Sequence, residues 1–180
     1  MSFLGATAPQ QQGGIIMVGR FLETFCNGLR ILLGCLMASL AVPVGMQVIS
    51  RYTGIIPTFL WTEELATFIF VWVVMIGSMV AVWDGTHFDV VITPDAQSPL
   101  GKLIQTWVVY IFITIFALLF AWYGIEYAKV GSIQSSVMMR ANLLWIYISV
   151  PVAGVVWAMF SGYRLYEALT TYQLSKRATS

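Results

Sequence analysis

Two groups of residues in this chain carry side chains that could do chemistry. One is the acidic pair Glu63 and Glu64, and the other is Asp84, His87 and Asp89, which includes the only histidine. Paired carboxylates can act as an acid and a base, and histidine with carboxylates can bind a metal ion. Which of these is realised depends on the elements that position the two groups.

Charged residues are scarce in this sequence and unevenly distributed. Only 9% of the 180 residues are charged and 59% are apolar, with a mean hydropathy of +0.83, whereas about 25% of a soluble domain is charged. Four windows lack any charged residue or histidine: 31–50, 65–83, 103–125 and 141–163. Because about 20 apolar residues in a helix cross a hydrocarbon core of roughly 30 Å, we predict an all-α integral membrane protein with four transmembrane helices.

The sequence before the first window predicts an additional helix. Between 15 and 30, polar residues recur at three- and four-residue steps among apolar ones: Arg20, Glu23, Asn27 and Arg30. This pattern is typical of an amphipathic helix. We favour an interfacial position for it, with an extension of the first span as the alternative. Residues 1–14 and 173–180 are predicted to be flexible, which leaves 15–172 as a single membrane domain.

Helix-end signals suggest a structural role for the acidic pair. Thr62 supplies a hydroxyl cap before the second span, and carboxylates at Glu63 and Glu64 stabilise the positive end of a helix dipole. Adjacent helical residues point about 100° apart, so the two acids are poorly placed to share a proton. We therefore favour helix-end stabilisation with an ion pair, either to Arg51 or to a partner chain. Asn142 is the predicted cap of the fourth span, which contains Pro151.

The histidine group lies in the polar connection between the second and third spans. A zinc or iron site needs three or four well-placed ligands, so a metal at Asp84, His87 and Asp89 is the alternative to a role for His87 at an interface. A single histidine outside the spans also excludes haem held by two histidines. We predict no catalytic residue, no metal and no cofactor on this chain, and the net charge of +1 gives no surface for nucleic acid.

Lysine and arginine set the predicted orientation, because they are enriched on the cytoplasmic side. Three lie on the side of the loops that follow the first and third spans: Arg51, Lys129 and Arg140. Six lie on the side of the termini: Arg20, Arg30, Lys102, Arg164, Lys176 and Arg177. Both termini are therefore predicted to be cytoplasmic.

Several motifs resemble the small membrane subunit of tripartite ATP-independent periplasmic (TRAP) transporters. These are Trp61-Thr62-Glu63-Glu64-Leu65-Ala66 leading into Phe70-Val71-Trp72-Val73-Val74-Met75-Ile76-Gly77, then Gly85-Thr86-His87-Phe88-Asp89-Val90, then Ser135-Ser136-Val137-Met138 with Leu144-Trp145-Ile146-Tyr147, Pro151 and Gly154. The resemblance extends over about 20–170. The chain departs from it at Trp83-Asp84, where many relatives have a basic residue, and in its long, Gln-rich lead.

The resemblance implies a role in transport without catalysis. In such systems a periplasmic binding protein delivers an organic acid, such as a C4-dicarboxylate or sialic acid, to a large multi-span membrane subunit. That subunit binds sodium and moves the substrate, and the small subunit is its scaffold in the bacterial inner membrane. The candidate contacts with the large subunit are Trp61, Glu63, Glu64, His87 and Asp89. Arg51, Lys129 and Arg140 form a candidate periplasmic docking surface, and membrane lipids are further partners.

Two other function classes remain open at this point. The chain could anchor a redox or lipid-modifying enzyme in the membrane, or it could form a small channel by itself. The lack of ionisable residues inside the predicted spans argues against carrying ions alone, because such residues usually bind the cargo. A visible spectrum of the purified chain and flux into liposomes, respectively, would distinguish these classes from a scaffold.

Overall fold

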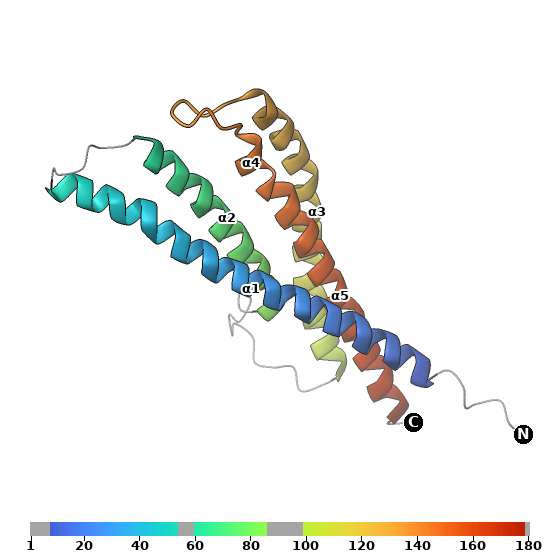
Figure 1. The fold of residues 1–180 in the computed structure, drawn as a ribbon. Coiled ribbons are helices and arrows are strands. Elements are labelled where there is room, and N and C mark those ends of the chain that lie inside the picture. Colours follow the sequence, from blue (N-terminus) through green and yellow to red (C-terminus); the bar gives the residue numbers. More distant parts are fainter. Residues whose placement is uncertain (1–7, 54–59, 86–98, 179–180) are drawn as a thin grey trace, which may run out of the picture.

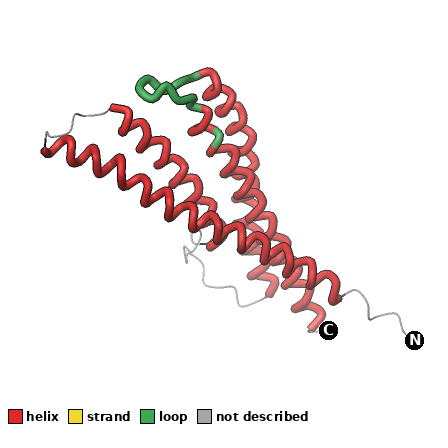
Figure 2. The backbone as a smooth tube through the Cα atoms, viewed as in Figure 1, coloured by secondary structure: helices red, strands yellow, loops and turns green. Residues whose placement is uncertain are grey.

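The computed structural model describes residues 8–53, 60–85 and 99–178, and these are almost entirely helical (Figures 1 and 2). The helices are α1 (Ala8–Thr53), α2 (Leu60–Asp84), α3 (Pro99–Ile133), α4 (Leu144–Tyr147) and α5 (Ser149–Ala178). Four segments are long and apolar enough to cross a membrane: Met17–Tyr52, Trp61–Asp84, Trp107–Ile133 and Leu144–Gln173. The prediction of an all-α fold with four spans is confirmed.

The first helix is longer than either element predicted for that part of the sequence. Residues 15–30 are helical, as predicted, and they continue without a break into 31–50, so they extend the first span, which was the alternative to a separate helix. At 1.5 Å per residue, the 46 residues of α1 extend over about 69 Å, more than twice the thickness of a hydrocarbon core. The helix must therefore be strongly tilted or extend beyond that layer, and it crosses α5 obliquely (Figure 1).

The second helix begins earlier than the sequence signals indicated. It starts at Leu60 and not at Leu65, so Thr62 is a buried residue inside the helix and not its cap. Glu63 and Glu64 nevertheless lie near the amino-terminal end of α2, where negative charge is favourable.

The fourth span begins just after Asn142 and is interrupted just before Pro151. The N-cap position of α4 is Leu143 and not the predicted Asn142, but the side-chain oxygen of Asn142, one residue earlier, accepts a hydrogen bond of 2.8 Å from the Leu144 N–H. Ile148 separates α4 from α5. Because Pro151 has no N–H, it cannot bond to the carbonyl four residues earlier, which favours a break at this point.

The helices pack as two pairs, α1 with α2 and α3 with α5, which meet in a shared core. The core includes Cys26 from α1, Met79 from α2, Ile113 from α3 and Phe160 from α5. The Phe160 ring is completely buried, with its centroid 5.1 Å from that of Trp83. From this core the two pairs diverge toward the ends of α1 and α3 (Figure 1).

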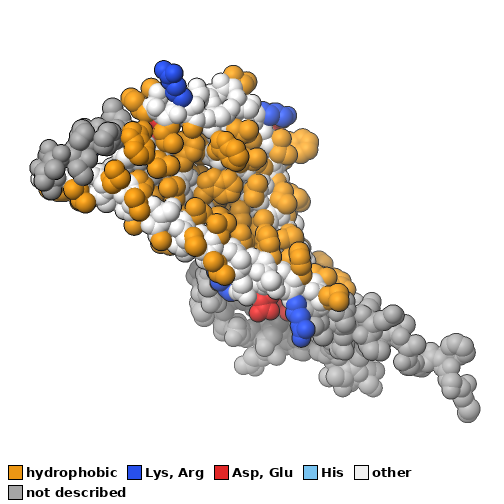
Figure 3. All heavy atoms as spheres, in the orientation of Figure 1, with side chains coloured by type: hydrophobic (Ala, Val, Ile, Leu, Met, Phe, Trp, Pro, Cys, Tyr) orange, Lys and Arg blue, Asp and Glu red, His pale blue; other side chains and the backbone are white. Residues whose placement is uncertain are grey.

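Apolar side chains also cover much of the outer surface. Figure 3 shows hydrophobic atoms over the middle of the visible face, with Lys and Arg toward both ends. Large rings on the outside include Phe112, which is 70% exposed, and Trp122, which is 72% exposed. An apolar area of this extent is typical of contact with lipid or with another membrane protein.

Candidate functional site

The acidic residue Glu64 holds the turn between α3 and α4. Its carboxylate accepts hydrogen bonds from the Ser136 hydroxyl, the Met138 N–H at 3.1 Å and the Met139 N–H at 2.9 Å. Within the same turn, the Ser136 N–H donates to the Ala141 carbonyl at 2.8 Å. A carboxylate with several acceptor positions is well suited to gather such donors. Glu64 is therefore an anchor for residues 134–143, which we call the α3–α4 turn.

Other side chains reinforce the same end of the molecule. The Trp72 indole N–H on α2 donates to the Trp145 carbonyl on α4 at 2.9 Å. The ring of Tyr127 on α3 stacks on that of Tyr147, with centroids 4.1 Å apart. Side chains from α2, α3 and α4 thus fix this end through a hydrogen bond and a ring contact.

The predicted periplasmic docking residues all lie exposed at this end. Arg51 is near the carboxyl terminus of α1, Arg140 is in the α3–α4 turn, and Lys129 pairs with Glu126 at 2.8 Å on α3. Within the described residues, no ion pair joins Arg51 to either acid of the Glu63-Glu64 pair. Glu64 instead uses neutral donors of the turn, and an ion pair of this acidic pair with a partner chain, the other predicted alternative, stays a prediction.

The remaining candidate contacts are only partly described. Trp61 is 41% exposed, and Glu63 is exposed on the first turn of α2. His87 and Asp89 lie outside the described residues. Asp84, which was weighed with them as a metal ligand, forms an ion pair with Arg30 of α1. Asp84, one of the two residues that depart from the family pattern, thus has its ionic partner within this chain.

Small residues allow α3 and α5 to approach closely. A Cβ atom added at Gly154 would lie 2.6 Å from the Ala121 nitrogen, and one at Gly124 would lie 2.8 Å from the Pro151 nitrogen. The Thr114 and Ser161 hydroxyls hydrogen bond across the same contact at 2.8 Å. The small residue Gly154 is thus used for packing inside the chain.

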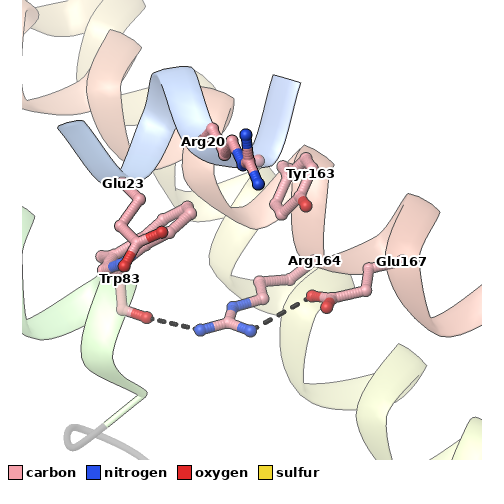
Figure 4. Close-up of a pocket in the computed structure, with 7 residues that line it drawn as sticks. Arg20, Glu23, Trp83, Tyr163, Arg164 and Glu167 are labelled. Atoms are coloured by element: carbon pink, nitrogen blue, oxygen red, sulfur yellow. Dashed lines mark hydrogen bonds and ion pairs between the residues drawn. The ribbon is translucent and has the colours of Figure 1, made fainter. Parts of the chain in front are cut away.

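At the opposite end from the turn, a charged pocket of about 240 Å³ lies between α1, α2 and α5 (Figure 4). Arg164 donates to the Trp83 carbonyl at 2.9 Å and to the Glu167 carboxylate at 3.1 Å, and its guanidinium lies 5.2 Å from the centre of the Trp83 ring. Gly19, Arg20, Glu23 and Tyr163 complete the lining. Sequence reasoning missed this pocket, although Arg20 and Glu23 were noted as the polar side of an amphipathic helix.

A family model matches 40–171, most of this chain. It describes the DctQ component of tripartite ATP-independent periplasmic transporters. The chain belongs to this family. The resemblance to the small TRAP membrane subunit is therefore confirmed, and a comparison with curated proteins gives no significant match.

The DctQ match includes most of the features described above. It covers α2 with Glu64, the α3–α4 turn and the contact between α3 and α5. It begins after Arg20, Glu23 and Arg30, so the α1 side of the charged pocket precedes the region that the DctQ model describes.

Proposed function

We propose that this chain is the small permease subunit of a sodium-coupled, binding-protein-dependent TRAP transporter for an organic acid. In this proposal it is not an enzyme, and it acts as a scaffold that holds the large transport subunit in the bacterial inner membrane. The observation that carries the proposal is the DctQ match over 40–171.

The packing of the chain supports a scaffold role. The close approach of α3 and α5 at Gly124 and Gly154 leaves little room for one helix to slide past the other. At the turn, Glu64 is engaged by donors of its own chain. These polar groups stabilise the subunit itself, which is why we assign sodium and substrate binding to the large subunit and no cofactor to this chain.

The proposed contacts with the other components include the exposed residues near the α3–α4 turn. We propose that both termini are cytoplasmic, which places Arg51, Lys129 and Arg140 on the periplasmic side, available to the binding protein. Trp61 and Glu63, together with His87 and Asp89, are proposed to contact the large subunit. Glu64 would contribute indirectly, since its carboxylate positions the α3–α4 turn at the end of α2 where Trp61 and Glu63 lie.

Reconstitution tests this proposal directly. The large subunit is placed in liposomes with or without this chain, and uptake of labelled C4-dicarboxylates and sialic acid is measured with the binding protein and an inward sodium gradient. We expect sodium-dependent uptake of one acid only when both membrane subunits are present. Equal uptake without this chain, or uptake by this chain alone, would contradict the scaffold role.

A further inference from the structure

The pocket between α1, α2 and α5 combines two cations and two anions. Arg20 and Glu23 project from α1, and Arg164 and Glu167 project from α5 (Figure 4). The formal charges of these four side chains cancel. A pocket of this kind attracts neither a simple anion nor a simple cation strongly, because each would meet a like charge within it.

Half of these charges are already paired, and half are not. Arg164 is held by Glu167 and by the Trp83 carbonyl, yet its Nε atom is buried and has no hydrogen-bond partner among the described residues. The side chains of Arg20 and Glu23 likewise form no ion pair or hydrogen bond within the described part of the chain. One unpaired cation, Arg20, and one unpaired anion, Glu23, therefore border the same cavity (Figure 4), and Arg164, whose buried Nε–H has no partner among the described residues, also lines it.

The surroundings of the pocket are those of a membrane interface. Trp83 and Tyr163 line it near one end of the spans, where such rings commonly meet lipid headgroups. On α1, Met17 and Phe21 flank the pocket residues in sequence and are 77% and 68% exposed. A polar cavity is thus placed beside an apolar surface, which is the arrangement that a phospholipid requires.

We propose that this pocket binds the zwitterionic headgroup of a phospholipid that carries a phosphate diester and a primary ammonium. The phosphate lies against the unpaired guanidinium of Arg20, on the side of the pocket that Arg164 also lines, because guanidinium groups match phosphate oxygens in geometry and charge. The ammonium group lies against the Glu23 carboxylate, which accepts its N–H donors. A lipid bound here connects the amino-terminal part of α1 to α5.

This site goes beyond the proposed transport function. Its α1 residues precede the region matched by the DctQ model, and binding requires neither the large subunit nor an organic acid. The lipid test can therefore fail while the scaffold proposal stands, and the reverse also holds.

Native mass spectrometry of the full, delipidated chain in mild detergent tests the site. Phosphatidylethanolamine and phosphatidylglycerol are added as probes, and the bound fraction is measured for each. We expect phosphatidylethanolamine to bind about tenfold more tightly, a difference that one charge-assisted contact can supply. Glu23→Gln should remove this preference, and Arg20→Gln should weaken both lipids. Glu126→Gln is the matched control, because Glu126 is an exposed carboxylate at the other end of the molecule.

Three results would overturn the proposal. These are equal binding of the two lipids, an unchanged preference in Glu23→Gln, and displacement of the lipid by free phosphoethanolamine at the same concentration, which would assign the site to a soluble ligand. Glu23→Asp separates charge from folding: it keeps the carboxylate, so the preference for phosphatidylethanolamine must persist in that variant. Its loss there would also contradict the assignment.

Discussion

Two adjacent carboxylates of this chain have different environments. The Glu64 side chain gathers a hydroxyl and two backbone N–H groups of the α3–α4 turn, whereas Glu63 next to it is exposed. The backbone N–H groups of a turn lack the regular partners that a helix provides and would otherwise bond to water. One carboxylate that accepts from several of them can therefore order several residues at once. The pair is therefore divided into a structural residue and a surface residue.

Replacing Glu64 by Gln should loosen the turn. The amide offers one acceptor oxygen in place of two and no negative charge, so the Met138 and Met139 N–H groups should exchange with deuterium severalfold faster. Hydrogen–deuterium exchange of the detergent-solubilised chain measures this directly. Glu63→Gln is the control and should leave both amides unchanged; equal exchange in the two variants would show that Glu64 does not hold the turn.

At the scale of the elements, the four spans were predictable because each is a long uncharged run. The start of α2 was not, since Thr62 resembles a cap until tertiary packing is known, and the pattern at 15–30 left a separate helix and an extension of the first span both open. Contacts such as Glu64 with Ser136 join residues 72 positions apart. A single sequence contains no signal for such pairings, and the charged pocket was missed for the same reason.

The contact between α3 and α5 should be sensitive to one added methyl group. We expect Gly154→Ala to lower the free energy of unfolding by about 1–3 kcal/mol, because its Cβ would meet the backbone of Ala117 and Ala121. Gly162→Ala on the same helix has open space and should be neutral or stabilising by up to about 1 kcal/mol. Denaturation in detergent measures both, and a Gly154→Ala variant as stable as Gly162→Ala would disprove the tight contact.

The hydrogen bond between α2 and α4 should make a smaller contribution. Trp72→Phe removes the indole donor to the Trp145 carbonyl while keeping an aromatic ring. We expect it to lower the free energy of unfolding by about 1 kcal/mol. Trp122→Phe on the exposed face of α3 is the matched control and should lower the free energy of unfolding by less. The same denaturation measurement compares the two, and no difference between them would indicate that the hydrogen bond adds nothing.

For the whole molecule, the proposed orientation makes the turn and the carboxyl terminus lie on opposite sides of the membrane. Arg140→Cys and Lys176→Cys, each in a chain whose native cysteines are replaced by serine, can be labelled with an impermeant thiol reagent. We expect Arg140→Cys to react in cells with an intact inner membrane and Lys176→Cys to react only after that membrane is permeabilised. The reverse pattern would invert the topology and place the docking residues in the cytoplasm.

We propose that this chain, a member of the DctQ family, is the fixed partner of a larger transport subunit. The most direct measurement is purification of the tagged chain from its native membrane in mild detergent, with quantitative mass spectrometry of the proteins that accompany it. We expect a much larger multi-span protein in near-equal amount. Recovery of a soluble enzyme as the equal partner, or of the chain alone, would contradict it.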